Sequence, residues 1–86
     1  TAGRMVIDAW PDPATTRLTI AVQSAVADQV TLQLCNVLGR MLREHSLQIT
    51  PGVRTVDIEV GDLPRGMYLL ACRSARATVL RKLMLQ

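Results

Sequence analysis

The sequence predicts an all-β fold, an immunoglobulin-like antiparallel β-sandwich of about seven strands. Apolar and polar residues alternate along most of the chain, which is typical of strands that bury one face. Turn-forming residues interrupt this alternation at short, fairly even intervals, as they do in β-sandwiches. Helical spacing fits poorly throughout. The expected strands cover residues 4–8, 17–23, 28–36, 40–47, 53–60, 66–73 and 77–85.

The alternation is clearest in the second, third and fifth of these strands, which contain RLTIAV, QVTLQL and RTVDIEV. Successive side chains of a strand point to opposite faces, so each segment has one apolar face to bury and one polar face to leave in water. In the sixth strand, Tyr68 alternates with Leu70 and Cys72. We therefore expect Tyr68 in the core, with its hydroxyl group reaching a hydrogen-bond partner.

The segments between the strands have turn chemistry, most clearly in WPDPATT, NVLGR, TPGV and LPRG, and less clearly in SAVAD and RSARA. Gly39 can take a positive φ at no steric cost. Pro51 and Gly52 suit the two central positions of a type II turn. Pro64 begins another turn, which closes at Gly66 directly before the sixth strand.

The composition fits a single domain, residues 4–86, preceded by a linker remnant of residues 1–3. Hydrophobic residues make up 49% of the chain, which excludes a disordered tail. Phe is absent and Trp and Tyr occur once each, so we expect a core of Val, Leu, Ile, Met and Ala. The chain lacks an initial Met, a signal peptide and any window apolar enough for a membrane-spanning helix. We therefore expect a piece of a longer protein.

Few residues suggest catalysis, and we expect no catalytic, cofactor or metal site. His45 is the only histidine, and its neighbours Glu44 and Ser46 would face the opposite side of a strand, so the three cannot form a relay. Asp57 and Glu59 share a face that the alternation leaves in water. No glycine-rich phosphate loop occurs in the sequence.

The charged, aromatic and cysteine residues give little support for nucleic-acid, sugar or metal binding. The net charge is +3, but the positive residues are scattered and base-stacking aromatics are scarce, so nucleic-acid binding is not expected. Trp10 could stack on a sugar, although we prefer packing against the nearby prolines and the sandwich edge. Cys35 and Cys72 are too far apart for a metal knuckle. Alternation places Cys35 outward and Cys72 inward, so we prefer two free thiols to the alternative, a disulfide that closes a long loop.

Three blocks of the sequence carry a resemblance to a known family. They are Pro11-Asp12-Pro13-Ala14 followed by Leu18-Thr19-Ile20, then VTLQLCNVLGRML, then Leu63-Pro64-Arg65-Gly66-Met67-Tyr68 with the terminus Lys82-Leu83-Met84-Leu85-Gln86. Along almost its whole length the chain resembles the type A C-terminal sorting domain of proteins exported by the type IX secretion system. The family usually has Asn at the position of Asp12.

The resemblance implies a C-terminal signal that directs a larger cargo protein from the periplasm across the outer membrane, to the cell surface or the medium. It implies three partners: the upstream cargo domain, the outer-membrane secretion machinery, and a surface sortase that normally removes the domain. No nucleic acid and no direct membrane insertion are expected. The alternatives are a retained, uncleaved interaction domain of the secretion machinery and a generic adhesive or carbohydrate-binding module. An exposed edge strand could also pair two copies.

The resemblance also implies where the signal lies. Recognition is expected at Gly39, Arg40, Pro64, Gly66, Tyr68, Lys82, Leu83, Met84 and Leu85. Cleavage is expected before the Pro-x-Pro block, in the neighbourhood of Thr1, Ala2 and Gly3. The chain would then be a substrate of the sortase and not an enzyme.

Overall fold

The computed structural model describes residues 5–11, 16–75 and 77–85, and the all-β prediction is confirmed. The strands are β1 (Met5–Pro11), β2 (Arg17–Ser24), β3 (Asp28–Asn36), β4 (Met41–Ile49), β5 (Gly52–Glu59), β6 (Gly66–Arg73) and β7 (Thr78–Leu85). The largest difference from the predicted bounds is at β1, which continues to Pro11. Proline is tolerated there because β1 is an edge strand. No helix that could cross a membrane occurs in the described ranges.

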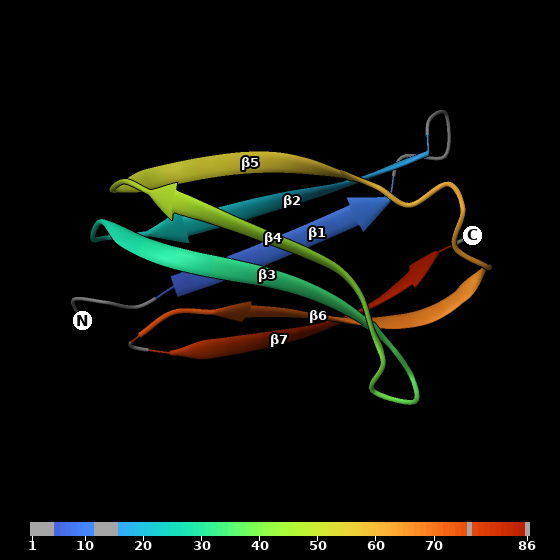
Figure 1. Ribbon diagram of the computed structural model, residues 1–86. Helices are drawn as coiled ribbons and strands as arrows, with labels where there is room; N and C mark the ends of the chain where they lie inside the picture. The colour runs from blue at the N-terminus through green and yellow to red at the C-terminus, as the bar shows by residue number, and fades with distance from the viewer. Residues whose placement is uncertain (1–4, 12–15, 76, 86) are drawn as a thin grey trace.

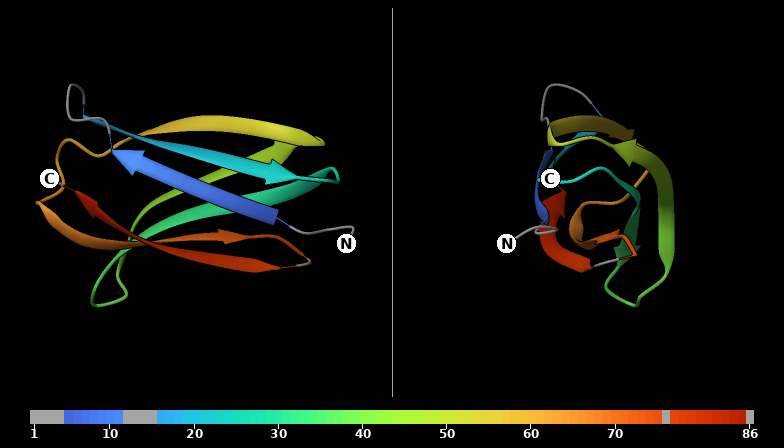
Figure 2. Two further views of the ribbon diagram at one scale, coloured as in Figure 1. Left: turned by 180° about the vertical axis from the view of Figure 1, so that it is seen from behind. Right: turned by 90° about the vertical axis from the view of Figure 1, so that its left-hand side faces the viewer.

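The strands form two antiparallel sheets that pack face to face (Figures 1 and 2). The three-stranded sheet has the order β1-β2-β5, and the four-stranded sheet has the order β4-β3-β6-β7. In constant-type immunoglobulin domains the fourth strand joins the sheet of the first, second and fifth strands. Here β4 instead pairs with β3, across a bulge at which Leu34 lies opposite Arg43 and Cys35 opposite Met41.

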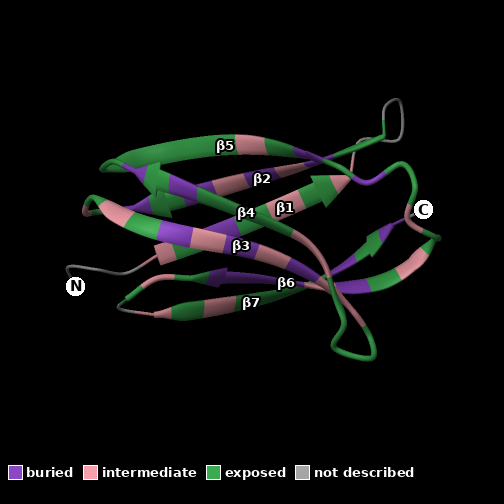
Figure 3. Cartoon of the chain, viewed as in Figure 1, coloured by how far each residue is buried: buried purple, intermediate pink, exposed green. Residues whose placement is uncertain are grey.

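The core lies between the two sheets and is built from alternate residues of each strand (Figure 3). Burying one such Val, Leu or Ile side chain contributes about 1.5–3 kcal/mol. The buried cluster consists of Ile7, Leu18, Ile20, Val22, Val30, Leu32, Leu34, Leu47, Ile49, Ile58, Val60, Tyr68, Leu70, Cys72, Leu83 and Leu85. The inward faces predicted for the second, third and sixth strands are thereby confirmed.

Methionine departs from the predicted core composition. Of the four methionines, only Met5 packs against the buried cluster, whereas Met41, Met67 and Met84 are exposed. The expectation of a methionine-containing core is therefore wrong for three of the four residues. All three take part in strand pairing, Met41 with Cys35 and Met67 with Met84, but their side chains point away from the facing sheet.

Arginines on three edge strands reach across the open sides of the sandwich. Arg81 of β7 donates to the carbonyl oxygen of Ile7 in β1 at 3.2 Å. On the other side, Arg54 of β5 donates to Gln48 O at 2.9 Å, and Arg43 of β4 donates to Glu59 O at 3.2 Å. Arg81 and Arg54 each stand two residues before a side chain, Leu83 and Val56 respectively, that lies in the core or packs against it. Inward-pointing charges of this kind protect edge strands from pairing with another chain.

Candidate recognition end of the sandwich

The corner between β5 and β6 is held by Tyr68. Its ring is buried, and its hydroxyl group donates to the carbonyl oxygen of Pro64 at 2.5 Å, which confirms the prediction of a core tyrosine with a partner. Gly66 has a φ of 147°, and Leu63 N donates to Val60 O at 3.0 Å. A tyrosine near the start of the sixth strand that bonds back to the upstream backbone is the tyrosine corner of immunoglobulin-like sandwiches.

The hairpin between β3 and β4 is organised by Asn36. Its side-chain oxygen accepts hydrogen bonds from the backbone N–H groups of Leu38 and Arg40, both at 3.0 Å. The carbonyl oxygen of Asn36 accepts another from Gly39 N, also at 3.0 Å. Gly39 has a φ of 85°, so the predicted need for a positive φ is confirmed. The result is a tight turn that holds Arg40 in solvent.

The last strand divides its residues between core and surface. Leu83 and Leu85 are buried, whereas Lys82 and Met84 are exposed. The residues expected to carry recognition therefore fall into two groups. Tyr68, Leu83 and Leu85 build the fold, and Arg40, Pro64, Lys82 and Met84 are available to a partner.

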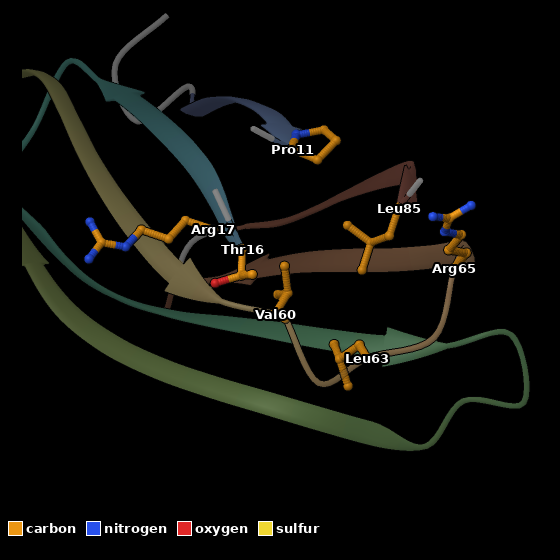
Figure 4. Close-up of a pocket in the computed structure, with 8 residues that line it drawn as sticks. Pro11, Thr16, Arg17, Val60, Leu63, Arg65 and Leu85 are labelled. Atoms are coloured by element: carbon orange, nitrogen blue, oxygen red, sulfur yellow. The ribbon is translucent and has the colours of Figure 1, made fainter. Parts of the chain in front are cut away.

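One end of the sandwich brings together Pro11 of the first block, the Asn36–Arg40 turn of the second, and Gly66 and Leu85 of the third. Gly66 pairs with Leu85, and Asn36 pairs with Tyr68, so the hairpin turn and the corner lie at the end where β7 stops (Figure 1). A pocket of about 200 Å³ at this end is lined by Pro11 from the first block and by Leu63, Arg65 and Leu85 (Figure 4). We call this region the recognition end.

The recognition end is electropositive. The side chains of Arg40, Arg65 and Lys82 make no ion pair or hydrogen bond within the described ranges. Arg43 instead pairs with Asp62, and the hydrogen bond from Arg43 holds the pKa of that carboxyl below its usual value. Arg65 was not among the expected recognition residues. Its position between Pro64 and Gly66, at the tip of a turn, is the sequence feature that could have predicted an exposed residue there.

The candidate catalytic residues remain apart. His45 is exposed. Asp57 accepts a hydrogen bond from Thr19 at 2.8 Å, and Glu59 accepts one from Thr16. No cluster of three potential metal ligands occurs among residues 5–11, 16–75 and 77–85. In the same part of the chain, every buried side-chain nitrogen or oxygen atom has a hydrogen-bond partner.

The cysteines are free thiols, as predicted. Cys72 is buried beside Met5, with 3.6 Å between the two sulfur atoms, and burial raises the pKa of the Cys72 thiol to about 11. Cys35 points to the outer face of its sheet and is half-buried. Trp10 lies on β1 with 45% of its surface exposed, and Pro13, one of the prolines against which we expected it to pack, is outside the described residues.

Several predicted positions lie outside the described residues. They are Thr1, Ala2 and Gly3 of the cleavage neighbourhood, Asp12, Pro13 and Ala14 of the first block, and Gln86.

Fold and site together define a class: an immunoglobulin-like sandwich with a tyrosine corner and an electropositive end. The family model for the secretion system C-terminal sorting domain matches residues 8–86. The chain belongs to this family and is a C-terminal sorting signal of the type IX secretion system. No significant match to a curated protein was found. Membership implies a cargo protein, secretion machinery, and a destination outside the cell or on the outer-membrane surface.

Proposed function

We propose that this chain is a sorting signal that is cleaved from its cargo after export. Residues 4–86 act as one folded domain that takes an upstream cargo across the outer membrane, and a surface sortase then removes it near Thr1, Ala2 and Gly3. Residues 1–3 form the linker to the cargo. The observation that carries the proposal is the family match over residues 8–86, joined to the meeting of the sequence blocks at one end.

The chain acts in this proposal as a passenger and as a substrate, with no catalytic role of its own. Its support is chemical. His45 is exposed and has no hydrogen-bond partner among the described residues, and the carboxylates of Asp57 and Glu59 bond to threonines on a solvated face. A nucleophile needs a base within hydrogen-bond reach. No such pair is formed by His45.

In this proposal the secretion machinery recognises the folded recognition end. Gly39, Pro64, Gly66 and Tyr68 set its shape, and Leu83 and Leu85 fix β7 to the core. The exposed side chains of Arg40, Lys82 and Met84 then make the contacts. A dimer through an edge strand is the weaker expectation, because arginines on three of the four edge strands already donate across the open sides.

Deleting residues 82–86 would not separate loss of recognition from loss of folding, because it removes Leu83 and Leu85 from the core. A sharper test joins a reporter protein to the intact chain in a cell with a functional type IX system. We expect the reporter at the cell surface or in the medium, and in the periplasm when the outer-membrane machinery is absent. A reporter that stays in the periplasm of the competent cell contradicts the sorting function.

Mass spectrometry of the exported reporter tests removal separately. We expect the mature product to lack residues 4–86. Export with the whole domain still attached would overturn cleavage and favour a retained interaction domain, while leaving sorting intact. A core variant, Leu32→Asp, is the folding control, since Leu32 has no exposed surface and its loss should block export through unfolding.

A further inference from the structure

Apolar side chains lie next to one another on the outer face of the four-stranded sheet. Nine large hydrophobic residues are exposed in the described part of the chain. Three of them, Val6, Trp10 and Val53, belong to the three-stranded sheet. The other six belong to the four-stranded sheet or to its β3–β4 hairpin: Val37, Leu38, Met41, Met67, Leu80 and Met84. A solvated sheet face normally carries polar residues, so a group of adjacent apolar residues on it needs an explanation.

The strand register makes these residues one continuous surface. Met67 lies opposite Met84, and Ala71 lies opposite Leu80, across the β6–β7 ladder. Between them Leu69 lies opposite Lys82 on one side and Cys35 on the other, and Cys35 in turn pairs with Met41. Directly opposite side chains in a sheet are in contact range, and diagonal ones are within reach of long side chains. We call Cys35, Met41, Met67, Leu69, Leu80 and Met84 the methionine face.

The methionine face is already closely packed within its own sheet. Ala71 points away from the core, yet it is only 6% exposed, because its neighbours cover it. Away from the methionine face the outer sides of both sheets carry polar pairs, such as Thr19 with Asp57 on one sheet and Gln33 with Glu44 on the other. Contiguous exposed apolar surface on a soluble domain marks an interaction site. Methionine side chains adapt to irregular partner surfaces, which suits such a site.

Charge selects the partner. Lys82 lies in the middle of the methionine face and Arg40 at its rim, and neither side chain has a partner within the described ranges. Next to this face, Gln33 accepts a hydrogen bond from Arg73 at 2.8 Å and donates one to Glu44 at 3.0 Å, so one cation and one anion lie there together. The face therefore carries an excess of positive charge. Two copies placed face to face would oppose Lys82 to like charges, which disfavours self-association.

A lipid surface fits less well than a protein. Membrane-binding faces carry aromatic residues at the headgroup level. The only tryptophan, Trp10, lies on the opposite sheet, and Tyr68 is buried. A flat, apolar sheet with one central cation instead matches a protein surface that is apolar in its middle and bears carboxylates.

We propose that the methionine face docks onto a protein component of the export machinery, through an apolar surface that presents a carboxylate to Lys82. This inference rests on the proposed sorting function. It extends the recognition end from Lys82 and Met84 along the outer side of β6 and β7, and it states the chemistry of the partner.

The test uses the reporter joined to the full chain, with two variants of the face, Leu80→Glu and Met84→Glu. The matched control is Val53→Glu, which places the same charge at a position 66% exposed on the other sheet. We expect both face variants to lower the exported fraction at least tenfold and the control to leave it unchanged. Thermal melting of the purified chains should give the same midpoint for all three. Equal export of Leu80→Glu, Met84→Glu and Val53→Glu would overturn the proposal.

Lys82 gives a second arm. We expect Lys82→Glu to lower export and Lys82→Arg to retain it, and equal export of the two overturns the role of the cation. Sedimentation tests self-association: a dimer that Leu80→Glu dissociates would assign the face to a second copy instead. Flotation with phosphatidylglycerol vesicles tests lipid: binding that Leu80→Glu abolishes would assign it to the membrane. A wild-type chain that exports no reporter removes the sorting function itself, and this inference with it.

Discussion

The hydroxyl group of Tyr68 donates a hydrogen bond to the carbonyl oxygen of Pro64, four residues earlier in the chain, at 2.5 Å. The bond joins the connection between β5 and β6, which crosses from the three-stranded to the four-stranded sheet, to the start of β6. Because the ring is buried while Pro64 is exposed, the bond ties a surface corner to the core. The position of the exposed residues of that corner thus depends on a core side chain.

Tyr68→Phe should destabilise the domain by about 1–2 kcal/mol, because it removes this bond and keeps the ring. Tyr68→Ala should cost about 3–5 kcal/mol, since it also leaves a cavity. Urea unfolding measures both. Equal midpoints for wild type and Tyr68→Phe would show that the corner is held by packing alone.

Gly39 and Arg40 should separate a structural from a contact role. Gly39→Ala places a side chain at a φ of 85° with no atom within 4 Å of the added carbon, so the cost is backbone strain of about 1–2 kcal/mol. Arg40→Glu should leave the unfolding midpoint unchanged and lower reporter export. The control is the double variant Gln23→Glu with Gln48→Glu, which makes the same total charge change at exposed positions of other strands. Export of Arg40→Glu at the level of this control would exclude a contact role for Arg40.

The cysteines should react at different rates with a thiol reagent. At pH 8 we expect Cys35 to react in the folded chain and Cys72 only after unfolding, because the Cys72 side chain has no exposed surface. Counting modified thiols by mass spectrometry, with and without urea, checks this. Fast modification of Cys72 in the folded chain would contradict its burial.

Cys72 should also make the domain sensitive to alkali. Its pKa is raised from 9.0 to about 11 in the folded chain, so the folded state keeps a proton that the unfolded state loses. The stabilisation is fully present below pH 9 and is lost as the pH rises to about 11. Its size is on the order of 2–3 kcal/mol. Urea midpoints between pH 8 and 11 should fall more steeply for wild type than for Cys72→Ala, and parallel curves would count against this assignment.

Arg81 should protect the edge of β1. Removing its side chain in Arg81→Ala leaves the carbonyl oxygen of Ile7 without this donor, and exposed strand edges associate with other chains. We expect a loss of about 1–2 kcal/mol in stability and concentration-dependent association on sedimentation. Lys82→Ala is the control, because its side chain is exposed and unpaired. If the two variants sediment alike, Arg81 has no protective role.

Alternation was enough to predict the strands and most of the core, because the two-residue period reports directly which side chains face inward. It failed where a strand is apolar on both faces. In β6 the buried set begins with Tyr68 and the outer set with Met67, and both sets are mainly apolar, so the pattern has no polar face to contrast. This is why the methionine face was not predicted.

Sheet membership was also beyond the sequence. The alternation in β4 is equally compatible with pairing to β3 or to β5, since it states which face is buried and not which neighbour bonds. The arginines could have indicated which strands lie at the sheet edges. Arg54 and Arg81 stand where an inward apolar residue would continue the pattern, and a charge at such a position is typical of an edge strand.

The directions of the first and last strands have a mechanical consequence. β1 and β7 run the same way along the long axis of the molecule, so Met5 and Leu85 lie at opposite poles, 37 Å being the longest dimension (Figures 1 and 2). A cargo joined ahead of Met5 and a machine that grips the far pole would stretch the domain along its strands. Hydrogen bonds between antiparallel strands are perpendicular to that direction, so tension shears whole ladders together instead of opening them one bond at a time. Under such a load the domain would transmit the force to its cargo while its strands stay paired.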